Sequence, residues 1–282
     1  MDFTNNSNLQ DYLRRKEMEE AAKKASRKRI VEEQNKKRWL EYQQHLRNTL
    51  GGSGYLGSSI GIVTDGLRLY YDPSILTSYS GSGTTISDLT ANGLNGTMSN
   101  ITYTKPYFNF NGSSSQISIA DNALLEPGTG DWTIDVWVNY SVIAGSSRVI
   151  VGKTDGGLAA DFGYGIRTNS AGATYFEVGN GTTSVTSPSS TLTTGVWYHL
   201  VGVFKNISTN AVEFYVDGTF IGSTSHSFTS IKNTTSPLYF GSFNGGEYSQ
   251  WFNGKMGSAI MYNRALSAAE VLQNYHANKP KY

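Results

Sequence analysis

The sequence predicts a mainly β protein, an antiparallel two-sheet sandwich that is preceded by a long α-helix and followed by a short one. Three observations support this fold class. All 31 glycines and all 6 prolines of the 282 residues lie after residue 50. Residues 8–49 have neither and are rich in Glu, Lys, Arg, Ala, Leu and Gln, which favour a helix. From residue 63 on, about a dozen short alternating stretches are separated by Gly, Asn and Ser turns, as in a β-sandwich.

The first element is predicted to be a helix of about 40 residues, roughly 60 Å long at the usual rise per residue. Ser7 or Asn8 can cap its start. Its apolar positions are thin and Ala-rich upstream, so a sustained heptad coiled coil is not predicted. A clearer stripe lies near its end and gives the candidate anchoring residues Trp39, Leu40, Tyr42, Leu46 and Leu50. We expect an arm that docks on an assembly or bundles with copies, a homo-oligomer; the alternative is a solvated charged helix.

Charge is distributed unevenly along the chain. Residues 1–50 hold 12 of the 23 Lys and Arg but only 8 of the 22 Asp and Glu. The basic runs at 23–29 and 36–38 are interrupted by glutamates at spacings that suit ion pairs along a helix. We therefore expect an ion-paired helix face rather than a nucleic-acid site.

Several classes of protein are excluded by composition. The chain has no cysteine, so disulfides, thiolate metal sites and cysteine nucleophiles are absent. No apolar stretch is long enough to span a membrane, and the N-terminus has no apolar core of a secretory signal. We expect a protein that is made in the cytoplasm without export through a signal peptide.

A Gly- and Ser-rich connector follows the arm. The composition of residues 51–62 is that of a flexible linker. The predicted organisation is therefore an anchoring or oligomerising arm at 1–50, a linker at 51–62 and a β domain at 63–282.

The β domain is predicted from alternation and turn residues. The expected strands are residues 66–71, 107–110, 116–119, 132–140, 148–152, 163–167, 174–178, 197–204, 212–216, 238–243 and 255–262. In the fourth of these, Trp132 and Trp137 fall on opposite faces, which predicts that both faces are covered. Asp217-Gly218 predicts a tight hairpin, and Ser267 followed by Glu270 predicts a capping box that starts the last helix.

Ordered motifs in this domain carry a family resemblance. They are Gly66–Asp72, Asp88–Thr97, Phe108–Gly112, Trp132–Val138, Gly195–Leu200, Val212–Gly218, Phe252–Gly257 and Ile260–Ser267. From about residue 65 to 276 their order resembles the concanavalin A-like lectin/glucanase superfamily, and within it the laminin G-like jelly-roll domains. The run Tyr79–Thr85 before Asp88 resembles versions in virion structural proteins of tailed bacteriophages.

This resemblance implies a virion structural protein: a capsid decoration, fibre or tail-associated protein located in the virion. Its arm is expected to bind other virion proteins, and its jelly roll to face outward, where it can bind host-surface glycan. The alternative is a soluble calcium-dependent carbohydrate-binding lectin whose helix only sets the oligomeric state.

The residues do not indicate an enzyme. Glucanases that this domain resembles carry two Glu with an Asp between them, one as nucleophile and one as acid. After residue 50 no two Glu lie within four positions of each other. The four histidines form no pair with metal-ligand spacing, and His199 is expected to be a half-buried structural residue.

Two loops contain the candidate binding residues. Asp155, Asp161, Asn244 and Glu247 offer the oxygen ligands that Ca²⁺ prefers, and Ca²⁺ is the one cofactor considered. Tyr248 and Trp251 can stack on a sugar ring. The competing interpretation is that the four polar residues form turns and that the aromatic residues fix the loop to the sheet.

Overall fold

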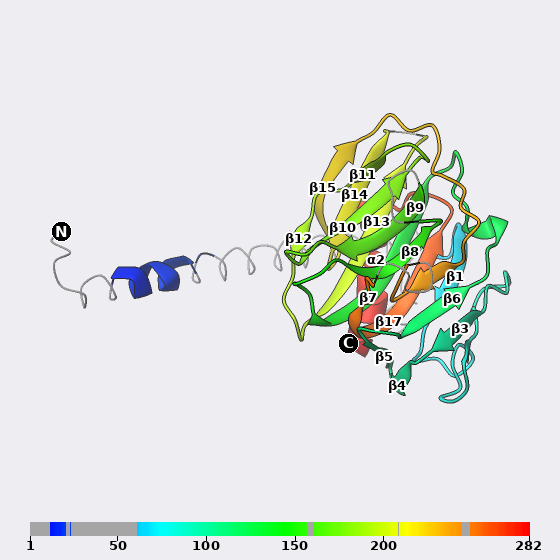
Figure 1. The fold of residues 1–282 in the computed structure, drawn as a ribbon, viewed down its shortest axis with the longest axis horizontal. Coiled ribbons are helices and arrows are strands. Elements are labelled where there is room, and N and C mark those ends of the chain that lie inside the picture. The colour runs from blue at the N-terminus through cyan, green and yellow to red at the C-terminus, as the bar shows by residue number, and fades with distance from the viewer. Residues whose placement is uncertain (1–11, 21–22, 24–60, 157–160, 208, 244–248) are drawn as a thin grey trace, which may run out of the picture. The chain divides into compact units, whose positions relative to one another are not determined.

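The computed structural model describes residues 12–20, 23, 61–156, 161–207, 209–243 and 249–282, which fall into two compact units, Met1–Ser58 and Ser59–Tyr282 (Figure 1). In the first unit residues 12–20 and Lys23 are helical. The helix described there is short, where the sequence predicted about 40 residues. The rest of the predicted helix and most of the linker lie outside the described residues. So do the anchoring residues Trp39, Leu40, Tyr42, Leu46 and Leu50.

The second unit is the predicted sandwich of two antiparallel sheets. Sheet A has the order β15-β14-β13-β7-β17-β5-β4, with β1 paired to β17. Its strands are β1 (Leu67–Tyr71), β4 (Thr102–Thr104), β5 (Tyr107–Asn111), β7 (Trp132–Val142), β13 (Trp197–Lys205), β14 (Ala211–Val216), β15 (Thr219–Ser225) and β17 (Asn253–Tyr262).

Sheet B has the order β11-β10-β9-β8-β16-β6-β3-β2, with β12 paired to β10. Its strands are β2 (Thr85–Ile86), β3 (Gly96–Ser99), β6 (Gln116–Ile119), β8 (Arg148–Thr154), β9 (Phe162–Thr168), β10 (Ala173–Gly179), β11 (Ser184–Thr186), β12 (Ser190–Thr191) and β16 (Leu238–Phe240). All eleven predicted strands are present. The strands β2, β3, β4, β11 and β12 were not predicted, since most are too short for alternation to be read, and β15 was expected only as the second arm of the hairpin at Asp217-Gly218.

One prediction was too long. The strand expected at 238–243 ends at Phe240, because Gly241 has a φ of 87° and turns the chain away from the sheet. The hairpin prediction is confirmed: Asp217 and Gly218 have φ values of 52° and 73°, the left-handed pair that a tight two-residue turn needs.

Among the described residues of this unit the helices are η1 (Ala123–Leu125), α2 (Ala268–Asn278) and η4 (Lys279–Lys281). The predicted capping box is present, with Ser267 and Glu270 each accepting from the other's backbone N–H. Among the described helices none is long and apolar enough to cross a membrane.

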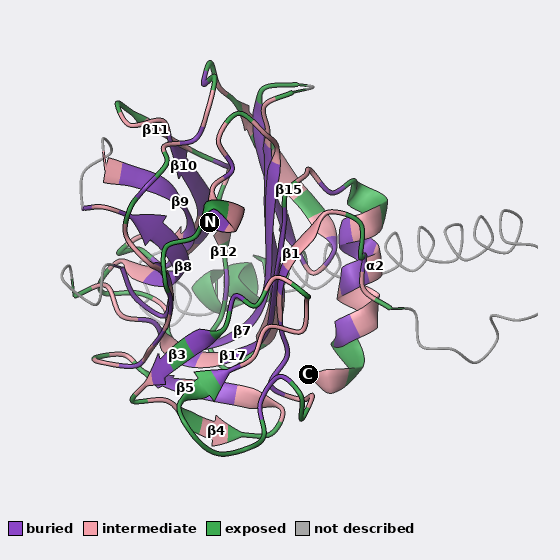
Figure 2. Ribbon diagram, turned by 90° about the vertical axis from the view of Figure 1, so that its right-hand side faces the viewer, coloured by how far each residue is buried: buried purple, intermediate pink, exposed green. Residues whose placement is uncertain are grey.

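The main core lies between the sheets, and β7 shows how alternation builds it. Trp132, Ile134 and Val136 point into this core, as predicted. Trp137 points the other way and is only 2% exposed, because it stacks on Tyr275 of α2 at 5.6 Å and 6°. Figure 2 shows α2 lying against the outer face of sheet A. The prediction that both faces of this strand are covered is confirmed.

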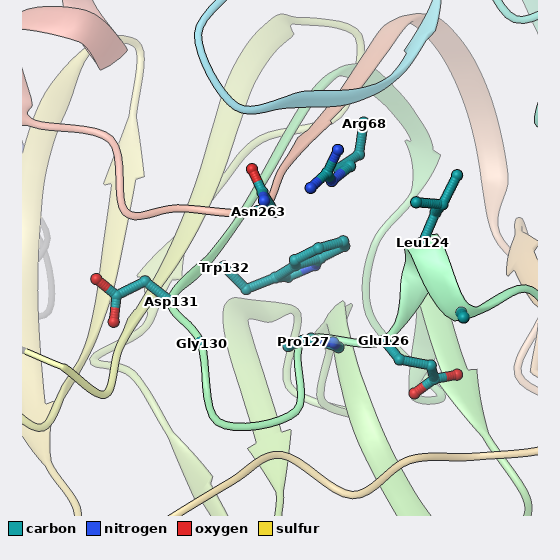
Figure 3. Close-up of a pocket in the computed structure, with 9 residues that line it drawn as sticks. Arg68, Leu124, Glu126, Pro127, Gly130, Asp131, Trp132 and Asn263 are labelled. Carbon is teal, nitrogen blue, oxygen red and sulfur yellow. The ribbon is translucent and has the colours of Figure 1, made fainter. Parts of the chain in front are cut away.

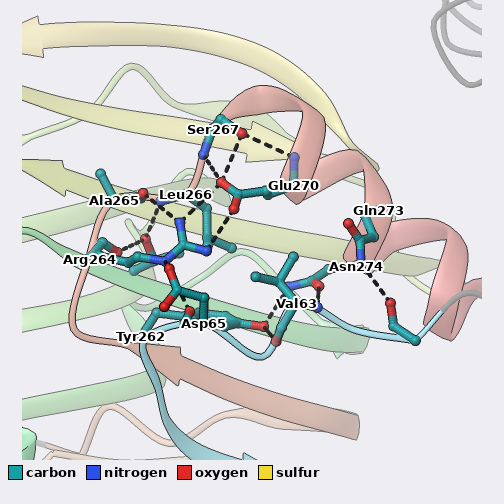
Figure 4. A network of polar contacts seen from close by, with 12 residues as sticks. Val63, Asp65, Tyr262, Arg264, Ala265, Leu266, Ser267, Glu270, Gln273 and Asn274 are labelled. Atoms are coloured by element: carbon teal, nitrogen blue, oxygen red, sulfur yellow. Dashed lines mark hydrogen bonds and ion pairs between the residues drawn. The ribbon is translucent and has the colours of Figure 1, made fainter. Parts of the chain in front are cut away.

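The start of the second unit is fixed to α2 (Figure 4). The N–H of Val63 donates to Asn274 Oδ1 at 2.8 Å, and the carbonyl of Val63 accepts from the Tyr262 hydroxyl at 3.0 Å. Gln273 Nε2 donates to the carbonyl of Gly61 at 2.9 Å. The chain therefore enters the sandwich on the outer side of sheet A.

Candidate binding surfaces

The outer face of sheet A holds a histidine–carboxylate pair that is closed to solvent. His199 Nε2 lies 2.9 Å from Asp135 Oδ1, and both side chains are 0% exposed. Asn274 of α2 donates to the other oxygen, Asp135 Oδ2, at 2.8 Å. His199 was expected to be half-buried; it is fully buried because Trp137 and α2 cover it. A substrate cannot reach this pair while α2 is packed, so its role is structural.

The outer face of sheet B carries charged groups on neighbouring strands. Arg167 on β9 is opposite Tyr175 on β10, and both point away from the core residues Ile166 and Phe176. Arg167 Nη1 lies 3.3 Å from Glu177 Oε2, with the two side chains 21% and 12% exposed. The outer face of sheet B thus holds an ion pair whose Arg167 is partly exposed and whose Glu177 is largely buried.

Two phenylalanines pack beside this ion pair. Phe162 and Phe243 meet edge to face at 5.4 Å, and the Arg167 guanidinium lies 5.9 Å and 5.7 Å from their ring centres. Gly152 makes room for Phe243, because a Cβ there would lie 2.0 Å from a ring atom. We call Phe162, Arg167, Tyr175, Glu177 and Phe243 the sheet-B patch.

The electrostatics of the sheet-B patch favour a polar ligand. Burial is the largest cause that raises the pKa of Tyr175; the Arg167 charge opposes it and Glu177 adds to it. The Tyr175 hydroxyl therefore stays protonated at neutral pH. Arg167 Nε is buried with no hydrogen-bond acceptor among the described residues. A planar cation and a phenol are groups that bind hydroxyls, and the buried rings of Phe162 and Phe243 support them from beneath.

The structure brings described residues that flank the two predicted loops together at this patch. Phe162 follows Asp161 directly and Phe243 precedes Asn244, and the two rings are in contact. Trp251 is half-buried; it forms a parallel bridge with Val149. Asn244, Glu247 and Tyr248 lie outside the described residues.

The predicted calcium ligands Asp155 and Asp161 face a lysine. Asp155 Oδ1 accepts from the N–H groups of Thr235 and Ser236 at 2.8 Å and 3.0 Å. Lys232 Nζ lies 3.3 Å from Asp155 Oδ2 and 3.8 Å from Asp161 Oδ1. Burial would raise the pKa of Asp155, but these N–H groups and the Lys232 charge outweigh it and hold that pKa below its usual value. No cluster of three or more His, Asp or Glu that could hold a metal occurs among the described residues.

Sequence reasoning missed Arg167 and Glu177. The available signal was a charged residue at the outward position of two strands that are otherwise apolar, Phe162–Thr168 and Ala173–Gly179. Spacing could not show that these charges pair, since that depends on the register of β9 with β10.

A pocket of about 190 Å³ lies at one end of the sandwich (Figure 3). It is lined by Arg68, Ala123, Leu124, Glu126, Pro127, Gly130, Asp131, Trp132 and Asn263. These residues come from β1, from η1 and the loop after it, from the start of β7 and from the end of β17. We call this the end pocket.

The buried ammonium of Lys153 neutralises the acidic side of the end pocket. Lys153, which is 0% exposed, forms ion pairs with Glu126 and with Asp121 at 2.7 Å, and donates to the Thr234 carbonyl at 2.6 Å. Burial is the largest cause that raises the pKa of Glu126, and Lys153 opposes it. The close pair of carboxylates at this end is therefore held by a buried ammonium.

Comparison with known proteins gives a family and several folds. A laminin G-type family model, described as the concanavalin A-like lectin/glucanases superfamily, matches residues 111–272. The Trypanosoma rangeli sialidase in complex with sialic acid is similar with a TM-score of 0.61 and 15% identity, over 88% of this chain and 39% of that chain. The binding domain of Paraclostridial Mosquitocidal Protein 1 is similar with a TM-score of 0.57 and 18% identity, over 75% of this chain and 52% of that chain.

A single domain also matches over nearly its whole length. Domain 4 of AbnA, an extracellular arabinanase from Geobacillus stearothermophilus, in complex with arabinotriose, gives a TM-score of 0.55 and 17% identity, over 74% of this chain and 98% of that one. At these identities the likeness concerns the fold, which occurs in enzymes and in binding domains alike. The chain spans well under half of the sialidase. No curated protein sequence matches it.

Proposed function

The chain belongs to the concanavalin A-like lectin/glucanase superfamily, and from this premise we propose that it is a non-enzymatic binding protein of a virion. In this proposal the N-terminal arm anchors the protein to other virion proteins and the jelly roll binds glycan on the host surface. The sheet-B patch is the binding surface.

The observation that carries the proposal is the position of the sheet-B patch. The outer face of sheet A is taken up by α2 and by the entering segment at Gly61 and Val63. The patch lies on the outer face of the other sheet, so the chain enters the domain on the side away from it. A domain whose chain enters on one face and whose binding surface lies on the other face suits outward display.

A sugar ligand fits the chemistry of the patch. Arg167 and Glu177 offer donors and acceptors side by side, and Tyr175 adds a hydroxyl, which is what a ring of hydroxyl groups needs. The AbnA domain, which has this fold, is complexed with arabinotriose. That complex supports a saccharide ligand over a peptide.

The absence of catalysis is supported by how the described carboxylates are engaged. Asp135 is buried against His199, and Glu126 is paired with Lys153. A glycosidase needs two carboxylates that face the same substrate bond, one of them protonated. These acids instead face buried cationic or imidazole groups.

Binding is tested with the full-length protein on a glycan array. Arg167→Ala should abolish the signal of any glycan that the wild type binds, whereas Lys105→Ala, which removes one exposed charge elsewhere, should leave it unchanged. Equal binding by both variants would show that the sheet-B patch is not the site. A wild type that binds no glycan would contradict the glycan part of the proposal.

Anchoring is tested by making the arm polar. Leu46→Asp together with Leu50→Asp should prevent incorporation into particles and lower the oligomeric state measured by light scattering. The domain should keep its circular dichroism spectrum. Normal incorporation of this double variant would contradict the anchoring role.

The soluble calcium-dependent lectin is the second candidate. It is favoured by the proximity of Asp155 and Asp161, since the N–H of Asp155 donates to the carbonyl of Asp161 at 3.0 Å, and it requires Ca²⁺ to replace the Lys232 ammonium that pairs with both carboxylates. Glycan binding that is lost on adding a chelator and restored by Ca²⁺ would support it. Glycan binding that does not change when the chelator is added would exclude the calcium-dependent lectin.

A further inference from the structure

The end pocket has a donor side whose groups lack a counter-charge. Arg68 is half-buried, and within the described part of the chain its guanidinium has no carboxylate partner. Its side chain donates to the amide oxygen of Asn263 at 2.5 Å, with that amide turned so that its nitrogen donates to the carbonyl of Gly66. Trp132 Nε1 is also buried without an acceptor among these residues. Of these two donors, Trp132 Nε1 lacks an acceptor among the described residues, and Arg68 has an amide acceptor but no carboxylate.

The acidic residues of the pocket do not supply one. Figure 3 shows the guanidinium of Arg68 and the amide of Asn263 near the indole of Trp132, with the carboxylates of Glu126 and Asp131 turned away from it. Glu126 is paired with Lys153, and Asp131 Oδ1 accepts from the N–H groups of Asn206 and Ile207 at 2.7 Å and 2.9 Å. An anion beside Arg68 would therefore meet acidic groups that already have partners.

The size and the walls of the pocket limit what can bind. At about 190 Å³ it is smaller than the sites of drug-sized ligands, which begin near 300 Å³. It can take one ring or a smaller group. Leu124, which is half-buried, gives some apolar surface against which the C–H groups of a sugar ring can pack, whereas Pro127 and Trp132 are themselves buried.

We propose that the end pocket binds one acidic sugar unit, a ring of the hexuronate type, whose carboxylate pairs with Arg68. The guanidinium matches a carboxylate with two parallel N–H donors, and Asn263 stands beside it. The inference rests on the proposed glycan-binding function and extends it, since it adds a second site and names its ligand class.

The test is a titration of the ¹⁵N-labelled full-length protein with glucuronate, glucose and acetate, followed by NMR. Glucuronate should shift the indole Nε1–H signal of Trp132 and bind at least about tenfold more tightly than either other compound, because one charge-assisted pair is worth about that factor. Glucose binding as tightly would overturn the role of the carboxylate. Acetate binding as tightly would show that the sugar ring is not recognised. If none of the three compounds shifts this signal, the end pocket is not a binding site for them.

Variants assign the effect to one side chain. Arg68→Gln should weaken glucuronate binding at least about tenfold. Arg68→Lys should weaken it less, since it keeps the charge but loses the planar fork. Lys105→Gln is the matched control for the loss of one charge and should bind as the wild type does. Wild-type affinity in Arg68→Gln, with a dispersed spectrum that shows it is folded, would overturn the proposal.

The two sites can fail independently. If the glycan array shows no dependence on Arg167 while glucuronate still shifts the Trp132 signal, the sheet-B patch is wrong and the end pocket stands. If glycan binding depends on Arg167 but glucuronate binding does not depend on Arg68, only the end pocket is wrong.

Discussion

The two outer faces of the sandwich are built by opposite means. The face of sheet A is closed by α2 over His199, Asp135 and Asn274, all fully buried, in which Asn274 donates to Asp135 and His199 Nε2 lies 2.9 Å from the other oxygen of Asp135. The face of sheet B carries the ion pair of Arg167, which is partly exposed, and Glu177, which is 9% exposed, beside Phe243, for which Gly152 leaves room. The same alternation along strands therefore yields a structural network on one side and a binding surface on the other, according to what lies on top.

This difference has an energetic meaning. A buried polar group that loses its partner cannot turn to water, so it costs much of its desolvation energy. A partly exposed ion pair has water as an alternative and contributes little. Charged or polar residues on sheet A should therefore matter for folding, and those on sheet B for binding.

The largest expected effect is that of Asp135→Ala. It removes the carboxylate that faces His199 and accepts from Asn274, and it should lower the free energy of unfolding by about 3–5 kcal/mol, measured by denaturant titration. The matched change on the other face, Glu177→Ala, should cost about 1 kcal/mol or less. Equal losses of unfolding free energy for the two variants would show that the two faces do not differ in this way.

A smaller effect is expected from Gly152→Ala on sheet B. The new methyl would lie 2.0 Å from the Phe243 ring, so the ring must move, at a cost of about 1–3 kcal/mol. Because Phe243 lies beside Arg167, glycan-array binding should fall as well. Gly61→Ala is the control, since nothing lies within 4 Å of its Cβ, and an identical loss of stability there would refute the packing explanation.

The third expected effect is a weaker dependence of stability on pH when His276, on the α2 helix that covers sheet A, is replaced by Gln. Burial first, then Lys279 and His199, lower the pKa of His276 to about 4. The unfolded chain takes up this proton near the ordinary pKa of about 6.5. The stability that neutral His276 contributes is thus complete above that pH and is lost as the pH falls toward 4. Thermal unfolding should show that His276→Gln is less sensitive than the wild type between pH 6.5 and 5; identical profiles would contradict this.

The two faces also differ in how far the sequence reveals them. Alternation in β7 predicted that Asp135 and Trp137 share a face, and the capping box at Ser267 predicted the helix that covers them. It did not predict that Asp135 meets His199, because their opposition depends on the register of β7 with β13. The loops at Asp155 and Trp251 were chosen from composition, while Arg167 beside them was missed, since its environment comes from β8, β10 and Phe243.

By itself the sequence determined the sandwich, its main strands, the hairpin at Asp217-Gly218 and the resemblance that the family match confirms. These are local properties: side-chain alternation, turn residues and caps act over a few neighbouring positions. Only the tertiary structure decided that His199 is fully buried, that Phe162 meets Phe243, and that Arg68 lies in a pocket without a carboxylate partner among the described residues. These features join residues from strands far apart in the chain, so they depend on strand register and layer packing, which no short stretch of sequence specifies.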